Sequence, residues 1–323
     1  LMRNIGVNAY RFSIAWPRII PDGDGPVNQQ GIDFYDRLVD ALLEAGITPF
    51  ATLYHWDLPQ KLQDKDGWNN RATAYSFARY ADAITQALGD RVKHWMTHNE
   101  PWCTVFLGHH MGIFAPGIQN LKVALQASHH VLLSHGLAVK AMRSNVGALA
   151  QIGIAPNYTP AYPASDKPED ADAAERFDGY FNRWFFDPIF GKGYPADLWA
   201  HYGENVPQFQ TDDLNIIAAP IDFIGVNIYN PAYLRRADGD FGFEQVRQPG
   251  LGQTADRLIY APGITDMLLR VTRDYNPARI YITENGAAFD DVVDDGAIHD
   301  SGRVDFLRDH FACQYCGREG DLT

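Results

Sequence analysis

Six short apolar runs alternate along the chain with segments of helical periodicity, and this alternation restricts its fold more than any other feature. The runs are rich in β-branched and aromatic residues and are nearly continuous in hydrophobicity, which is typical of strands buried on both faces. We therefore predict strands at residues 7–14, 47–55, 93–99, 150–156, 221–229 and 279–285.

The segments between these runs have the spacing of amphipathic helices. In residues 31–45, for example, Ile32, Tyr35, Val39 and Leu42 recur on one helical face, and Gly46 follows as a helix stop. The order of strand then helix predicts parallel strands joined by right-handed helical crossovers. The other predicted helices are residues 73–88, 121–144, 168–186 and 262–275.

Two stretches, residues 101–120 and 230–261, directly follow predicted strands and are too long to be simple connections. In an α/β barrel the loops after the strands carry the active site, so insertions are expected there. An open doubly wound sheet would instead carry a glycine-rich phosphate turn after its first strand. The sequence has no such turn, and we predict a barrel.

Composition excludes several classes of partner. The chain has 323 residues, with 40 acidic against 27 basic side chains and a net charge of −13. Nucleic acids and anionic membrane surfaces repel a chain this acidic, and no run of about 18 apolar residues could span a bilayer. We expect neither nucleic acid nor membrane as a partner and a cytoplasmic location. The sequence does not indicate an oligomeric state.

Two carboxylates end predicted strands that are far apart in the sequence. Glu100 follows the third strand in the string THNEPW, and Glu284 ends the sixth in TENG. A carboxylate directly after an apolar strand is costly unless it is solvated or paired. A barrel would bring both to one mouth, where two facing carboxyls beside aromatic and amide side chains suit the cleavage of a glycosidic bond.

Other polar residues have simpler structural interpretations. Arg11 could be a buried ion-pair partner, for which Glu284 is a candidate, and Asn99 and Asn227 could be turn formers. His129, His130 and His135 lie in one predicted helix without the spacing of a metalloprotease motif, which favours a helix-face role. Cys313 and Cys316 form a lone C-x-x-C that supports neither zinc nor redox chemistry.

Taken together, these strings resemble family 1 of the glycoside hydrolases, β-glucosidase-type enzymes on a TIM barrel. The resemblance covers residues 1–312 and implies hydrolysis with retention of anomeric configuration, without a cofactor or metal. The matching strings, in the family's order, are YRFSIAWPRI, YHWDLP, THNEPW, FAPG, NRWFFDPIFGKGYP, DFIGVNIY and ITENG.

The resemblance also assigns catalytic roles. Glu100 corresponds to the general acid/base and Glu284 to the nucleophile. Asn99 corresponds to the amide that binds the sugar 2-hydroxyl. Arg11 and the Tyr229 hydroxyl would hold the Glu284 carboxyl in its ionised form, as a nucleophile requires.

Four further residues correspond to substrate contacts. His55 and Trp56 match residues that bind the glycone, and Asn227 pairs with Tyr229 near the nucleophile. Trp102 would line the aglycone side. The substrate is thus expected to be a β-glucoside or an oligosaccharide.

The sequence also departs from the family pattern. The Gln-containing segment of the family's first strand and the Asn-Phe-Glu-Trp stretch near its eighth are absent. We therefore expect an incomplete (β/α)8 TIM barrel of class α/β, with strands 2–7 present and strands 1 and 8 missing. Residues 1–312 would form a partial catalytic domain, followed by an aberrant tail at 313–323.

The function that we predict is a retaining β-glycosidase of the β-glucosidase type, with this chain as a fragment of it. One alternative is a 6-phospho-β-glycosidase, because the phosphate-binding residues would come from the absent eighth-strand loop. The other alternative is an inactive fragment that at most binds sugar.

Overall fold

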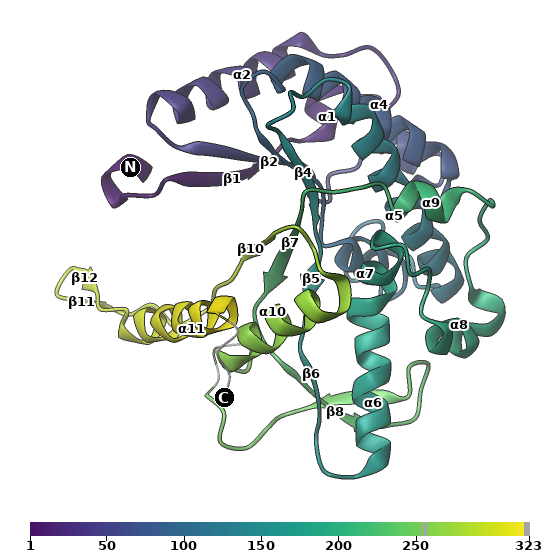
Figure 1. Cartoon of the computed structure of the whole chain (residues 1–323), viewed down its shortest axis with the longest axis vertical. Coiled ribbons are helices and arrows are strands. Elements are labelled where there is room, and N and C mark those ends of the chain that lie inside the picture. The colour runs from purple at the N-terminus through teal and green to yellow at the C-terminus, as the bar shows by residue number, and fades with distance from the viewer. Residues whose placement is uncertain (253, 255–256, 320–323) are drawn as a thin grey trace. The chain divides into compact units, whose positions relative to one another are not determined.

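All six predicted strands are present in the computed structural model, each within two residues of its predicted bounds. The structure describes residues 1–252, 254 and 257–319, with side chains as far as residue 315. The chain divides into one compact unit of residues 1–157 and 185–225 and a second of residues 158–184 and 226–323 (Figure 1). The predicted strands are β1 (Ala9–Ser13), β2 (Thr48–Tyr54), β3 (His94–Asn99), β4 (Gln151–Ala155), β7 (Phe223–Ile228) and β10 (Ile280–Glu284).

The first unit is a parallel sheet covered by long helices. Strands β1, β2, β3, β4 and the first residues of β7 pair in this order, and each pairing is parallel, as predicted. The helices include α2 (Gln29–Glu44), α4 (Arg71–Leu88) and α5 (Leu121–Arg143), with α4 packed along α5 (Figure 1). Gly46 follows α2 with φ +73°, a left-handed conformation that confirms the predicted helix stop.

An aromatic cluster fills the space between these strands and α4. Trp16, Trp68, Phe77 and Tyr80 are all at most 1% exposed. The Tyr80 hydroxyl lies 2.9 Å from the Ile14 carbonyl oxygen and 3.0 Å from that of Leu53. Since it has one proton, it donates to one carbonyl at a time and ties α4 to the ends of β1 and β2.

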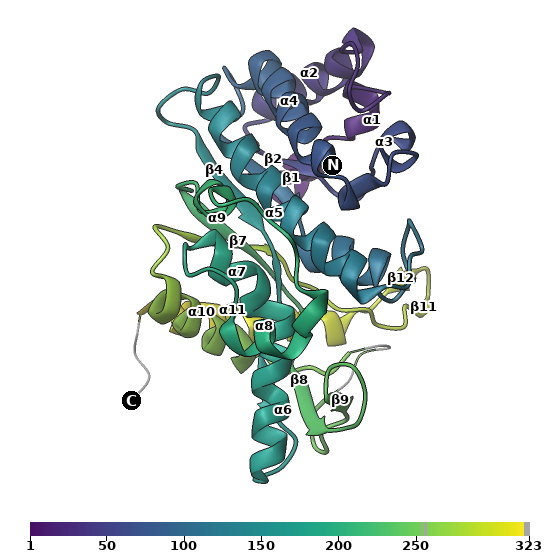
Figure 2. The same cartoon turned by 90° about the vertical axis from the view of Figure 1, so that its right-hand side faces the viewer.

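The second unit contains a small sheet and the C-terminal helices. The sheet consists of β6 (Ala161–Pro163), β8 (Ala232–Arg236) and β9 (Phe243–Val246), with α6 (Pro168–Asp178) lying along it (Figure 2). The later residues of β7 lie beside β10. Helices α10 (Pro262–Tyr275) and α11 (Ser301–Glu319) pack against each other.

The structure differs from the predicted elements in three places. The helix predicted at 168–186 is helical throughout, but it winds as α6, then as the π-helical segment η4 (Gly179–Arg183), and then as α7 (Trp184–Ile189). The segment 101–120 is not a plain loop, since residues 101–109 are helical and contain the π-helical segment η3 (Cys103–Leu107). The segment 230–261 contains β8 and β9.

The remaining elements are short, apart from α11. Helices of three to seven residues are too short to show a repeating apolar stripe, which is why the sequence did not predict them. The short elements are η1 (Met2–Ile5), α1 (Trp16–Ile19), α3 (Gln60–Gln63), η2 (Gly67–Asn69), β5 (Asn157–Tyr158), α8 (Ala196–Tyr202), η5 (Gly203–Asn205), α9 (Asp213–Ile217), β11 (Val293–Asp294) and β12 (Ala297–Ile298).

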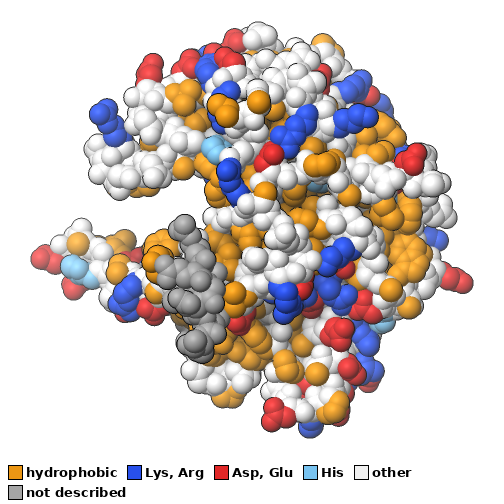
Figure 3. Space-filling view, in the orientation of Figure 1, with side chains coloured by type: hydrophobic (Ala, Val, Ile, Leu, Met, Phe, Trp, Pro, Cys, Tyr) orange, Lys and Arg blue, Asp and Glu red, His pale blue; other side chains and the backbone are white. Residues whose placement is uncertain are grey.

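The helices and the charged surface bear on the expectation that neither a membrane nor a nucleic acid is a partner. Among the described residues, no helix combines the length and apolar character needed to cross a membrane. On the face shown in Figure 3, Lys and Arg side chains lie among Asp and Glu side chains, so neither sign of charge gathers there.

A buried ionic cluster ties α4, α5 and α9 together. Arg71 donates to both carboxylate oxygens of Asp213, at 2.5 and 2.6 Å. His129 Nε2 lies 2.9 Å from the same carboxylate and its Nδ1 lies 3.0 Å from the Tyr194 hydroxyl. Burial alone would raise the pKa of Asp213, but hydrogen bonds from Arg71, the Gln210 N–H and His129 outweigh it and hold the pKa below its usual range.

We predict that Asp213→Asn lowers the free energy of unfolding by about 3 kcal/mol at pH 7, because breaking a buried pair leaves the Arg71 charge uncompensated. The carboxylate of Asp213 stabilises the fold above its unfolded pKa of about 3.9, and this contribution is lost as the pH falls through the lower native pKa. The difference between wild type and variant should therefore shrink below about pH 4. Urea unfolding followed by circular dichroism at pH 7 and pH 3.5 measures both values.

A matched control for this prediction is Asp22→Asn. Asp22 pairs with Lys61 at 2.6 Å, but both side chains are about half exposed or more. An exposed pair contributes at most about 1 kcal/mol. Equal losses in the two variants would show that the Asp213 cluster does not hold the three helices.

Candidate active site

Glu100 lies at the end of β3, where the backbone changes direction. The register between β3 and β4 shifts between Met96 and Asn99, and Glu100 has a φ of +45°, which is uncommon outside glycine. The carbonyl oxygen of Glu100 accepts the N–H groups of Cys103 and Thr104 and so begins the next helical segment. The Glu100 side chain is 7% exposed, and its Oε2 accepts a hydrogen bond from the Cys103 thiol at 3.1 Å.

Asn99 is held from three sides. Its Oδ1 accepts a hydrogen bond from Arg11 Nη2 at 2.5 Å, and its Nδ2 lies 3.3 Å from His55 Nε2. The indole N–H of Trp56 donates to the Asn99 carbonyl oxygen at 3.0 Å. Arg11 also donates to Thr52 at 3.1 Å. Four of the predicted site residues are thus joined in one hydrogen-bond network in the first unit.

Asp57 is a polar residue of this region that the sequence analysis missed. It lies in the string YHWDLP just after β2, and burial raises the pKa of its carboxyl to about 6 against the opposing effects of backbone N–H groups and Arg18. The signal was available, since Asp57 closely follows an apolar strand, the same criterion that identified Glu100.

Trp102, predicted on the aglycone side, lies in the helical turn after Glu100. It is 9% exposed, and its ring centroid is 5.9 Å from that of Phe106. Trp102 completes the set of predicted site residues that the first unit holds.

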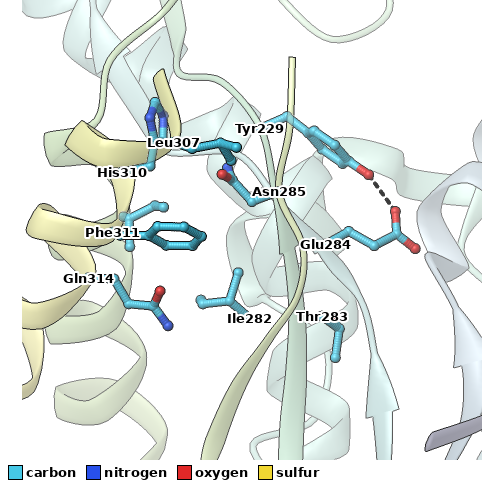
Figure 4. Close-up of a pocket in the computed structure, with 10 residues that line it drawn as sticks. Tyr229, Ile282, Thr283, Glu284, Asn285, Leu307, His310, Phe311 and Gln314 are labelled. Atoms are coloured by element: carbon cyan, nitrogen blue, oxygen red, sulfur yellow. Dashed lines mark hydrogen bonds between the residues drawn. The ribbon is translucent and has the colours of Figure 1, made fainter. Parts of the chain in front are cut away.

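In the second unit, Glu284 ends β10 and lies beside Tyr229. The Tyr229 hydroxyl donates a hydrogen bond to Glu284 Oε2, while the Glu284 side chain points away from His310, Phe311 and Gln314 of α11 (Figure 4). The guanidinium carbon of Arg257 lies 4.4 Å from the centroid of the Tyr229 ring. A cation over the ring face makes the phenol a better hydrogen-bond donor.

Asn227 lies inside the second unit. It is 0% exposed, and its Oδ1 accepts a hydrogen bond from the Thr283 hydroxyl at 2.6 Å. Asn285, the residue just after β10, donates from its Nδ2 to the Ile228 carbonyl oxygen at 2.8 Å. These two bonds fix β10 beside β7 on either side of Glu284, so the position of the carboxyl depends on both.

We predict that Tyr229→Phe moves the acidic limb of the pH–rate profile to higher pH and lowers kcat at least about tenfold. The reason is that a hydrogen bond to a charged group is worth about 1.5–3 kcal/mol, and its loss makes the ionised Glu284 less favourable. The pH dependence of nitrophenyl β-glucoside hydrolysis measures both effects. An unchanged acidic limb would mean that this hydrogen bond does not influence the carboxylate.

The predicted site residues divide between the two units. Arg11, His55, Trp56, Asn99, Glu100 and Trp102 lie in the first, and Asn227, Tyr229 and Glu284 in the second. The separation of the two carboxyls and the pairing of Arg11 with Glu284 remain predictions.

The structural interpretation of the three histidines of α5 is confirmed. His129 bonds to Asp213, His130 Nδ1 lies 2.9 Å from the Trp68 carbonyl oxygen, and His135 Nδ1 lies 2.7 Å from the Thr97 hydroxyl. Burial lowers the pKa of each. In the part of the chain that the structure describes, no group of three His, Cys, Asp or Glu side chains could hold a metal ion.

Comparison with known proteins gives a consistent result. The sequence profile described as glycosyl hydrolase family 1 matches residues 1–315. Beta-glucosidase A of Acetivibrio thermocellus is 46% identical over 321 residues, which cover 96% of this chain and 70% of that protein. Beta-glucosidase A of Thermotoga maritima is also 46% identical, over 96% of this chain and 70% of its own length.

A solved structure agrees with these sequence relatives. The Thermotoga maritima family 1 glycoside hydrolase complexed with a cyclophellitol analogue as transition-state mimic superimposes with a TM-score of 0.96 at 43% identity. The match covers 99% of this chain and 72% of that one. The fold class is therefore a TIM-barrel-like α/β fold.

Proposed function

We propose, since this chain belongs to glycosyl hydrolase family 1 and is a retaining β-glycosidase, that Glu284 is its nucleophile and Glu100 its general acid/base. The observation that supports this assignment most directly is the hydrogen bond from Tyr229 to Glu284. A donor at this position favours the ionised carboxylate, which a nucleophile must be.

The reaction then proceeds in two displacements. Glu284 attacks the anomeric carbon while Glu100 protonates the departing glycosidic oxygen, giving a covalent glycosyl-enzyme intermediate. Glu100, now ionised, removes a proton from the water that hydrolyses this intermediate. Two inversions give net retention, and this geometry requires carboxyls roughly 5 Å apart.

The remaining predicted residues bind the sugar or orient the carboxylates. We assign Asn99 to the 2-hydroxyl of the glycone, because Arg11 and His55 hold its amide in one orientation. His55 and Trp56 would contact the other glycone hydroxyls, and Trp102 the aglycone. Arg11 would contribute a positive charge beside Glu284, and Asn227 would fix the strand that carries it.

The substrate is proposed to be a β-glucoside without a phosphate group. Relatives at 43–46% identity are named β-glucosidases, which does not favour the 6-phospho alternative. Comparing the turnover of nitrophenyl β-glucoside with that of nitrophenyl 6-phospho-β-glucoside tests the assignment. Faster hydrolysis of the phosphorylated substrate would overturn it, and hydrolysis of neither would favour a sugar-binding fragment.

We propose further that this polypeptide supplies strands two to seven of an eight-stranded barrel, within residues 1–312, with 313–323 as an aberrant tail that begins within α11. In support, β1 and β10 each pair with one neighbour among the described strands, and the chain spans about 70% of the length of its relatives. A cytoplasmic location without a nucleic-acid or membrane partner would suit the net charge of −13.

A further inference from the structure

The thiol of Cys103 lies against the Glu100 carboxyl and has no role in the proposed reaction. Cys103 comes three residues after Glu100, one turn along the helical segment that follows β3. Its N–H donates to the Glu100 carbonyl oxygen at 3.0 Å, and its Sγ lies 3.1 Å from Glu100 Oε2. Cys103 thus binds both the backbone and the side chain of the same residue.

Asn157 approaches the same sulfur atom. It is 8% exposed, and its Nδ2 lies 4.0 Å from Cys103 Sγ. An amide N–H can only donate, so the sulfur accepts from Asn157 while the thiol proton is donated to Glu100 Oε2. Cys103 itself is 8% exposed, so bulk water competes little for this proton.

We propose that Cys103 is a positioning residue for Glu100, whose thiol donates a hydrogen bond to the carboxylate and favours its ionised form. This inference rests on the proposed acid/base role of Glu100. The contact is short for a thiol donor, and a donor to the ionised form makes the carboxyl more acidic. The thiol donor would therefore assist the second displacement, in which Glu100 acts as a base. It would oppose the first displacement, in which Glu100 must be protonated.

The test is a titration of the Glu100 carboxyl itself. The chain has eight glutamates, so labelling them with ¹³C at the side-chain carboxyl gives a small set of NMR signals, and Glu100→Gln identifies that of Glu100. Cys103→Ala should raise the titration midpoint of this signal by about half a pH unit or more. Cys103→Ser keeps a donor in the same place and should leave the midpoint within about 0.2 unit of wild type.

Two further variants complete the design. Cys103→Val, which fills the space of the thiol without donating, should shift the midpoint as Cys103→Ala does. Cys313→Ala removes a cysteine of α11 and should leave the Glu100 signal unchanged. An unmoved midpoint in the Ala and Val variants, or an equal shift in the Ser variant, would overturn the proposal.

The titration also separates this inference from the proposed function. It reports the ionisation of Glu100 whether or not the chain turns over substrate. If Glu100 is not the acid/base, the azide products described in the Discussion will not form, but the Cys103 shift will still be observed. If Cys103 has no influence, the azide products will form and the midpoint will not move.

Discussion

Replacing Glu284 with Gly in a protein extended to the full length of its relatives is expected to lower the turnover of every β-glucoside by ~10⁴-fold or more. Without the carboxylate no covalent intermediate can form, so even substrates with activated leaving groups are not hydrolysed through it. Added azide should occupy the space of the missing carboxyl and attack from the same face. The product, identified by NMR, should be the α-glycosyl azide.

The matched variant is Glu100→Gly, which removes the other carboxyl. Its first step should be largely spared for dinitrophenyl β-glucoside, because a good leaving group needs little protonation. Azide should then attack the glycosyl-enzyme from the opposite face and give the β-glycosyl azide. If the two anomers came out reversed, the assignments of Glu100 and Glu284 would have to be exchanged.

The second large effect concerns the 323-residue polypeptide on its own, which is expected to hydrolyse nitrophenyl β-glucoside at least about a hundredfold more slowly than an intact relative. A TIM barrel closes through eight strands. Here the outer edges of β1 and β10 have no partner among the described strands. Glycone contacts from two further strands would be absent, and interactions with sugar hydroxyls stabilise the transition state, so kcat should fall together with affinity.

The open edges have consequences that can be measured apart from activity. Val7 and Tyr10, before and in β1, are 39% and 38% exposed. A pocket open to solvent is lined by Ile282 of β10 and by Leu307 and Phe311 of α11. Unpaired apolar edges favour association, so size-exclusion chromatography should detect aggregates or oligomers. Turnover within about tenfold of an intact relative would contradict the prediction and would mean that another chain or segment completes the sheet.

The sequence predicted the strands well because buried parallel strands are almost continuously apolar, as Ile224 and Val226 in β7 illustrate. It did not predict where the winding of a helix changes. The predicted helix at 168–186 is helical throughout but becomes π-helical near Asn182, whose amide bonds with the backbone of Thr159 and with Asp178 instead of facing solvent. Such a contact between segments 23 residues apart leaves no periodic signal.

The candidate site was predicted chiefly from strings at strand ends, and most of its residues lie at or just after those ends, whereas Arg11 lies in the middle of β1. The contacts between them were only partly foreseen. The pairing of Arg11 with Glu284 stays a prediction, and the structure adds hydrogen bonds from Arg11 to Asn99 and Thr52. Neither bond could be predicted, because both residues are neutral and the charge argument considered only carboxylates.

The network around Asn99 determines which nitrogen of His55 carries the proton. Because Arg11 binds Oδ1, the Asn99 amide cannot flip, and its Nδ2 must donate toward His55. His55 Nε2 is then an acceptor, so the imidazole is neutral with its proton on Nδ1. In the proposed role of His55 as a glycone-binding residue, the sugar would meet a ring whose tautomer is fixed by the fold, so the entropy of fixing it is lost during folding and not during binding.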